Sequence, residues 1–399
     1  MTLPRAAGIA AALAAILVAG CGSTRAAAPA PGAGRAARPP LVTSLTIPGG
    51  PSWAIVEMGG PRARHNNFWQ LVTRPAGTAS WRLATPPGVA DNGGLVAASP
   101  GGPALVAGFN PSQDLTFSPL ASTRDGGARW TPSLLPAGLA RVPSALGTAP
   151  GGKLIAVTGR GQAELSAPGV PGWTRLASLA SLAATPAGRS CELKSLTAAA
   201  FSRLGVPLLA GQCAAPGVAG IFAYSAGGWH QAGPALPAAL ARRQVSVLKL
   251  TTAGRRTTAL LVAAAPGGAA SLIAAWAGPS GRWTLSAPLP LGGARILSTA
   301  TGTGAGEAAA TAASPGLASA AGVILSTGRA EFTAGPAADW QQLPALPAHV
   351  AALVLGPGRQ ISALAPSGSI LTSWHLAAGA VTWTMTQAMK VPVPYGSSG

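Results

Sequence analysis

Seven tryptophans recur along the chain at intervals of 43 to 57 residues, and this spacing constrains the fold more than any other feature. Most of them begin a short segment that ends in Leu and Pro, such as WTPSLLP, WTLSAPLP or WQQLPALP. Repeats of about 40 to 50 residues are typical of propellers and solenoids. The recurring residues are Trp81, Trp130, Trp173, Trp229, Trp283, Trp340 and Trp383.

Short apolar runs stand before these tryptophans and read as strands. Examples are 104–109, 153–158, 259–264 and 361–365, which are bounded by Pro-Gly, Gly-Gly or Ser-Gly turns. The 54 glycines and 38 prolines break long helices, so the many alanines do not indicate helix. The region 41–394 has room for seven repeats of about 50 residues. We therefore predict an all-β, seven-bladed β-propeller with four-stranded antiparallel blades.

Four other tryptophans fall inside expected second or third strands of the blades. They are Trp53, Trp69, Trp276 and Trp374. We expect most of the tryptophans to pack between blades, with sugar stacking as an alternative for one or two of them.

The segment TRDGGARW at 123–130 specifies a tight hairpin turn. Its aspartate can accept hydrogen bonds from its own turn, and its glycines can adopt positive φ. The segment resembles the Asp-box, or BNR repeat, Ser/Thr-x-Asp-x-Gly-x-x-Trp, at Thr123, Asp125, Gly127 and Trp130. The resemblance implies a turn between the third and fourth strands of a sialidase-like propeller blade. It implies a fold more than an activity, because Asp-boxes lie away from the catalytic face.

The N-terminus has the features of an export signal. Residues 1–20 contain Arg5 and then an apolar run that is short for a membrane-spanning helix. The sequence VAGC at 18–21 resembles the bacterial lipobox, which implies cleavage before Cys21 and lipid attachment, including palmitate, to it. Residues 21–40 then read as a flexible Ala/Pro/Gly/Arg tether, and 395–399 as a tail. We expect a lipoprotein at the outer face of the cell membrane, although an ordinary signal peptide remains the alternative.

The two remaining cysteines are consistent with an exported protein. The segment between Cys191 and Cys213 reads as a strand, a turn at Leu204-Gly205 and a second strand, so its ends should meet. We predict a disulfide that stabilises the fold by roughly 3 kcal/mol. A free thiol pair or a metal site is the alternative, but the Cys-x-x-Cys spacing is absent.

The charge of +18, from 27 basic and 9 acidic residues, favours anionic partners. We expect an acidic envelope polymer or an acidic protein partner, and no nucleic acid, because the sequence has no basic run or zinc pattern. The segment GGPRARHNN at 59–67 should connect the second and third strands of the first blade. Its Arg62, Arg64 and His65 could hold a carboxylate, with a solvated hairpin as the alternative.

The sequence offers little for catalysis. The sialidase pattern implies an arginine triad, an aspartate acid and a tyrosine nucleophile, yet only Tyr224 and Tyr395 are present and the nine acids stand apart. The four histidines have no metal-binding spacing, so we predict no cofactor or metal. We expect a monomeric, membrane-anchored binding or scaffold propeller. The alternative is a glycoside hydrolase of sialidase-like type with a degenerate site.

Overall fold

The computed structural model describes fourteen stretches of the chain. These are residues 42–47, 49–58, 68–86, 94–98, 105–109, 119–134, 143–158, 161–167, 172–253, 256–278, 280–302, 320–347, 349–356 and 360–392. Within these stretches the structure is almost entirely β-strand, and none of the helices is long and apolar enough to cross a membrane.

The described strands fall into seven consecutive groups of four, which we call blades 1 to 7. Blade 1 is β1 (Val42–Thr46), β2 (Ser52–Met58), β3 (Phe68–Arg74) and β4 (Arg82–Leu83). Blade 2 is β5 (Gly94–Ala98), β6 (Leu105–Phe109), β7 (Pro119–Thr123) and β8 (Thr131–Leu134). Blade 3 is β9 (Ala145–Thr148), β10 (Leu154–Val157), β11 (Gln162–Ser166) and β12 (Thr174–Ser178).

The second half of the chain follows the same pattern. Blade 4 is β13 (Leu193–Phe201), β14 (Pro207–Cys213), β15 (Ile221–Ser225) and β16 (Gly228–Gln231). Blade 5 is β17 (Gln244–Ala253), β18 (Arg256–Ala264), β19 (Ala270–Ala277) and β20 (Trp283–Leu285), with β21 (Leu289–Pro290) added beside β19. Blade 6 is β22 (Ile296–Thr301), β23 (Ala321–Leu325), β24 (Ala330–Thr333) and β25 (Gln341–Gln342). Blade 7 is β26 (Ala352–Leu355), β27 (Ile361–Ser367), β28 (Ile370–Leu376) and β29 (Thr384–Lys390).

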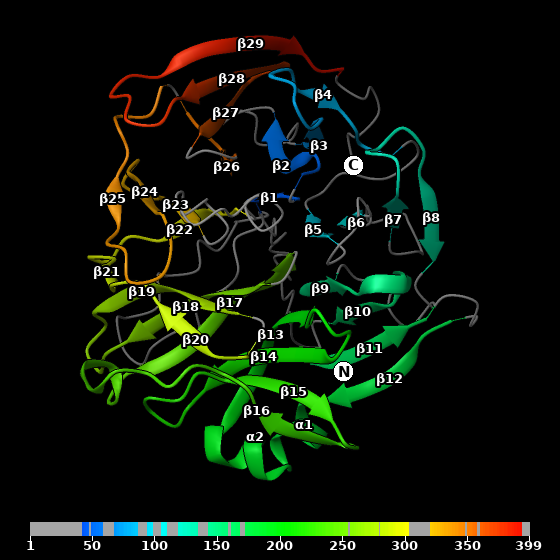
Figure 1. The fold of residues 1–399 in the computed structure, drawn as a ribbon, viewed down its shortest axis with the longest axis vertical. Coiled ribbons are helices and arrows are strands. Elements are labelled where there is room, and N and C mark those ends of the chain that lie inside the picture. The colour runs from blue at the N-terminus through cyan, green and yellow to red at the C-terminus, as the bar shows by residue number, and fades with distance from the viewer. Residues whose placement is uncertain are drawn as a thin grey trace, which may run out of the picture. The chain divides into compact units, whose positions relative to one another are not determined.

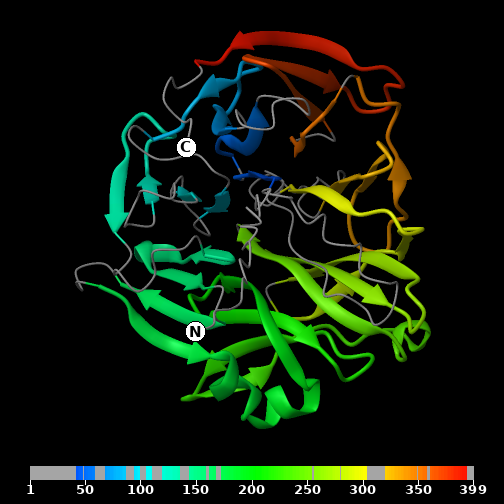
Figure 2. The same cartoon turned by 180° about the vertical axis from the view of Figure 1, so that it is seen from behind.

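The blades follow one another around a ring, so that blade 7 lies beside blade 1 (Figures 1 and 2). Within each blade, consecutive strands pair antiparallel; the first strand lies inward and the fourth lies outward. The inner strands also meet each other, because β1 pairs in parallel with β22. The predicted all-β propeller of four-stranded blades is therefore confirmed.

The recurring tryptophans owe their spacing to the blade interfaces. Each begins the fourth strand of a blade or lies at its start. Three of them donate their indole N–H to a backbone carbonyl just after the fourth strand of the preceding blade: Trp283 to Ala232 at 2.7 Å, Trp340 to Ala287 at 2.9 Å and Trp383 to Pro344 at 3.3 Å. In blades 5, 6 and 7, the recurring tryptophan thus joins the blade to the one before it.

The alanine-rich composition is explained by the close approach of the strands. Ala54, Ala156 and Ala259 lie in second strands and are fully buried. Where β9 passes β13 the space is smaller still, because a Cβ added to Gly147 would lie 2.7 Å from the Cα of Ala200. Small side chains let the sheets pack closely.

Two short helices between blades 3 and 4 are not predicted from the sequence. Helix α1 (Leu179–Ala183) begins with a capping box between Ser178 and Ser181, and α2 (Pro186–Cys191) begins at Thr185, whose side chain accepts from the Gly188 N–H. Two 3-10 turns, η2 (Pro150–Gly152) and η3 (Ala238–Leu240), complete the helical content of the described residues.

Candidate anion-binding site

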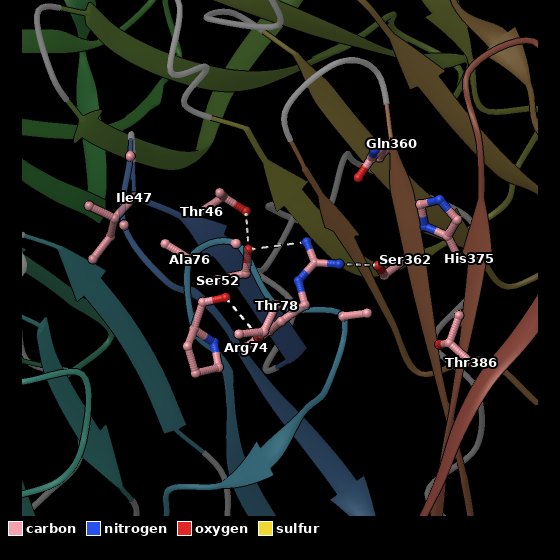
Figure 3. A pocket seen from close by; sticks show the side chains of 15 residues that line it. Thr46, Ile47, Ser52, Arg74, Ala76, Thr78, Gln360, Ser362, His375 and Thr386 are labelled. Carbon is pink, nitrogen blue, oxygen red and sulfur yellow. Dashed lines mark hydrogen bonds between the residues drawn. The ribbon is translucent and has the colours of Figure 1, made fainter.

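A cavity of about 660 Å³ lies between blade 1 and blade 7 (Figure 3). Blade 1 contributes the turn between β1 and β2 and the turn between β3 and β4. Blade 7 contributes side chains of β28 and β29 and of the start of β27. The polar residues of the lining are Thr46, Ser52, Arg74, Thr78, Gln360, Ser362, His375 and Thr386.

Two cross-strand pairs form the centre of this cavity. In blade 1, Ser52 of β2 is the partner of Arg74 of β3. In blade 7, Ser362 of β27 is the partner of His375 of β28. Among the described third strands of the blades, β3 and β28 alone carry a basic side chain. Ring closure therefore brings together two basic residues that lie about 300 positions apart in the sequence.

The guanidinium of Arg74 is buried, with 9% of the residue exposed. Its Nη1 donates to Ser362 Oγ at 2.9 Å and its Nη2 to Ser52 Oγ at 3.4 Å, while its Cζ lies 5.3 Å from the centre of the Trp81 ring. Burial lowers the pKa of Arg74, but an arginine stays charged in proteins. No carboxylate of the described residues forms an ion pair with it. Among the described residues, the partners of this buried positive charge are thus two neutral hydroxyl groups and an aromatic ring.

The hydroxyl groups around Arg74 are oriented by their other partners. Thr46 Oγ1 donates to the carbonyl of Leu355, so the 3.1 Å contact between Thr46 and Ser52 is donated by Ser52. The Ser52 hydroxyl therefore accepts a hydrogen bond from Arg74 and donates one to Thr46 Oγ1. Ser362 also accepts from Arg74, but its hydroxyl proton has no acceptor among the residues that the structure describes. That proton is available to a ligand in the cavity.

His375 completes the polar wall on the side of blade 7. Its ring is half-buried and has no hydrogen-bond partner in the described part of the chain. In Figure 3, Ser362 lies between the Arg74 guanidinium and the His375 ring. The described residues that line the cavity include no Asp or Glu. The arrangement can donate several hydrogen bonds to one anionic group, and its described lining holds no negative charge that would compete.

The 123–130 turn is closed by its own side chains. Thr123 Oγ1 donates to Asp125 Oδ1 at 2.8 Å and accepts from the Gly127 N–H at 2.9 Å. The Arg129 N–H donates to Asp125 Oδ1 at 2.9 Å and, with Thr123, holds the pKa of Asp125 below its usual value. These hydrogen bonds commit the carboxylate to the turn.

This turn packs against blade 1. The ring of Trp130 meets Trp53 edge-on at a centroid distance of 6.1 Å. Gly127 has φ of +88°, and a Cβ there would lie 3.0 Å from the Trp53 ring. Arg82 of β4 also donates to the Gly126 carbonyl at 2.8 Å. The turn therefore joins blades 1 and 2 and has no part in the cavity.

The predicted disulfide between Cys191 and Cys213 is confirmed, with the two Cα atoms 4.9 Å apart. Both residues are fully buried, and the strands β13 and β14 form the predicted hairpin around Gly205. One detail differs from the prediction. Cys191 is the last residue of α2, and Glu192, with φ of +50°, turns the chain into β13.

Four predicted site residues lie outside the described residues: Cys21, Arg62, Arg64 and His65. The segment 59–67 does connect β2 and β3, as the blade order predicts. It joins the strands at Met58 and Phe68, whereas Ser52 and Arg74 lie at their opposite ends. The Arg74 cavity is therefore a second candidate site, separate from the one predicted.

Arg74 is not among the site residues predicted from the sequence, and His375 is one of the histidines for which no role is predicted. One feature could have indicated Arg74, because no other described third strand of a blade carries an arginine or a lysine. No three His, Cys, Asp or Glu side chains gather within the described stretches.

Comparison with known proteins gives no family. A scan of protein families finds no match, and no curated protein matches the chain. Solved structures do resemble it. A protein from Lactobacillus plantarum is 11% identical, with a TM-score of 0.46 over 86% of this chain and 97% of that one. A lectin from Aleuria aurantia in complex with Fucα1-6GlcNAc is 12% identical, with a TM-score of 0.40 over 89% and 97%.

Another similar structure is YCF48 bound to D1 peptide, at 17% identity and a TM-score of 0.33. That match covers 61% of this chain and 65% of the YCF48 chain. The Aleuria lectin is described as a six-bladed β-propeller, whereas the described strands of this chain form seven groups of four. The strand pairing of the chain itself shows an all-β propeller.

Proposed function

We propose that the protein is a membrane-anchored, extracytoplasmic binding propeller that holds an anionic group of its ligand in the Arg74 cavity. The ligand is an acidic envelope polymer, or a partner protein that presents a carboxylate. This proposal combines the export signal and basic composition of the sequence with the charge found in the cavity.

The carrying observation is the buried guanidinium of Arg74 without a carboxylate partner in the described structure. A purely structural buried arginine normally pairs with an acid, because an unpaired buried charge costs several kcal/mol. Arg74 instead has two serine hydroxyls and the face of Trp81. A carboxylate from solution would supply the missing charge through a planar, two-pronged contact.

The size of the cavity supports a ligand larger than a water molecule or a simple ion. Its volume of about 660 Å³ lies within the usual range for small-molecule pockets. The two blade 1 turns that line the cavity contain Gly49, Gly50 and Gly77, which have no side chains to fill it. A single sugar residue with a carboxylate fits these dimensions.

Binding of D-glucuronate by the mature domain, followed by calorimetry at pH 8, tests the proposal. Arg74→Gln should weaken binding about 10- to 100-fold, because it removes a charge-assisted contact. Arg282→Gln is the matched control, since Arg282 is an exposed residue in the corresponding turn of blade 5. Circular dichroism checks that each variant is folded. Equal affinities for the wild type and a folded Arg74→Gln variant would refute the proposed site.

We also propose that the 123–130 turn is an Asp-box of the BNR type. The hydrogen bonds from the Arg129 N–H and from Thr123 to the Asp125 carboxylate support this assignment. Its location between β7 and β8, the third and fourth strands of blade 2, supports it further. Its role is to join two blades, so it adds nothing to the binding chemistry.

A further inference from the structure

We propose that His375 is the second cationic partner of the bound carboxylate, so that the cavity takes up a proton together with its ligand. This inference rests on the proposed function of the Arg74 cavity and adds its regulation by pH. The ligand group is a carboxylate, recognised by Arg74 on one side of Ser362 and by the protonated ring of His375 on the other.

The strand register places the two basic groups around one hydroxyl. Ser362 accepts from Arg74 at 2.9 Å, and its cross-strand partner is His375. Partners in adjacent strands point to the same face of a sheet, with Cβ atoms about 5 Å apart. A carboxylate that accepts the free hydroxyl proton of Ser362 would therefore lie within reach of both the guanidinium and the imidazole.

The groups around His375 include one charge. Among the described residues, the charged group that faces it from blade 1 is Arg74. On the strands beside it, the direct partners are Ser362 of β27 and Thr384 of β29, and neither titrates. No Asp or Glu is found among the described residues of the cavity lining. The bound carboxylate is thus the anion that favours protonation of His375.

Because ligand binding and protonation of His375 are thermodynamically linked, a lower pH must favour binding of the carboxylate. If the ligand promotes protonation of His375, protonation must promote ligand binding by the same factor. The carboxylate of glucuronate stays ionised between pH 5 and pH 8, because ordinary carboxyl groups titrate near pH 4. Histidine is the side chain that normally changes charge in this interval. We expect D-glucuronate to bind about tenfold more tightly at pH 5 than at pH 8.

Calorimetry in two buffers of different ionisation enthalpy measures the proton uptake directly. The wild type should take up a fraction of a proton for each D-glucuronate bound near pH 6.5. His375→Gln keeps a hydrogen-bonding side chain without the charge, so it should lose both the proton uptake and the tenfold gain. His230→Gln is the matched control, because His230 is an exposed histidine of blade 4 that contacts Ser225 O.

The outcomes separate this inference from the proposed function. If Arg74→Gln abolishes binding but the wild type binds equally at pH 5 and pH 8, the role of His375 is wrong and the site stands. The same holds if His375→Gln keeps the pH dependence of the wild type. If folded Arg74→Gln binds as the wild type does, both ideas fail. If the pH dependence of binding is lost in His230→Gln and kept in His375→Gln, it belongs to His230, and the inference is overturned.

Discussion

The side-chain amide of Gln387 hydrogen-bonds to both backbone groups of Trp81. Its Oε1 accepts from the Trp81 N–H at 2.7 Å, and its Nε2 donates to the Trp81 carbonyl at 3.0 Å. The two residues are 306 positions apart, in the last strand of blade 7 and directly before the last strand of blade 1. At the junction of blades 7 and 1, the Gln387 side chain thus makes the two hydrogen bonds that a paired strand would otherwise make to the Trp81 backbone. The same contact supports the Trp81 ring on which Arg74 lies.

Replacing Gln387 should destabilise the closed ring. Gln387→Ala leaves the Trp81 N–H and carbonyl without partners in a half-buried place, which costs about 1 to 3 kcal/mol. Urea unfolding followed by circular dichroism measures the loss. Gln342→Ala, at an exposed position in the outer strand of blade 6, is the control and should change stability by less than about 0.5 kcal/mol. Equal stabilities of the two variants would contradict the closing role of Gln387.

Lys249 introduces a pH dependence of stability. Lys249 is half-buried on the inner strand β17, where a bulge after Val247 interrupts the register, and its Nζ donates to the Ser44 carbonyl at 3.1 Å. Burial lowers the pKa of Lys249 to about 7. The unfolded chain, in which lysine titrates near pH 10.4, therefore binds more protons than the folded protein between these values. Stability should rise with pH from about 7 towards 10, with a slope of at most ~1.4 kcal/mol per pH unit.

Unfolding of two lysine variants at several pH values checks this expectation. Lys249→Met removes the buried amine, so its stability should lose this rise between pH 7 and pH 9. Lys194→Met, at an exposed position on β13, should retain the slope of the wild type. If the rise of stability with pH persists in Lys249→Met, it arises from another titratable group, and the prediction is wrong.

The lipid anchor is a prediction of the sequence that lies outside the described residues. Cys21→Ala removes the thiol that the lipobox would modify, so the precursor should stay uncleaved or the protein should leave the membrane fraction. Membrane fractionation and gel mobility of the two forms measure this. Unchanged mobility together with unchanged fractionation would remove the lipoprotein proposal.

The sequence predicts those parts of the fold that repeat. The tryptophan spacing predicts the start of each fourth strand, and in three blades the indole N–H donates to a carbonyl of the preceding blade. The turn at Asp125 and the hairpin between Cys191 and Cys213 are also predictable, since their partners lie within 22 residues. Such local contacts leave a pattern in the sequence that can be read directly.

The cavity could not be predicted in the same way. Arg74 and Ser362 are 288 residues apart, and their contact depends on which blade faces which after the ring closes. The local sequence around Arg74 or Ser362 contains no pattern that would predict this contact. The helices α1 and α2 were missed for another reason, since each is only five or six residues long and depends on its N-terminal capping residue.

The two candidate binding regions of blade 1 can be separated by their response to salt. Arg74 is buried, so its contact with a ligand is screened weakly, whereas exposed charges are screened beyond about 8 Å at physiological salt. Arg62→Ala with Arg64→Ala should leave the binding of D-glucuronate unchanged. If the 59–67 segment contacts long ligands, the double variant should weaken polygalacturonate binding at low salt and reduce its salt dependence. Arg74→Gln should weaken binding of both ligands at every salt concentration. A double variant that loses monomeric glucuronate while Arg74→Gln keeps it would transfer the site to the loop that the sequence predicts.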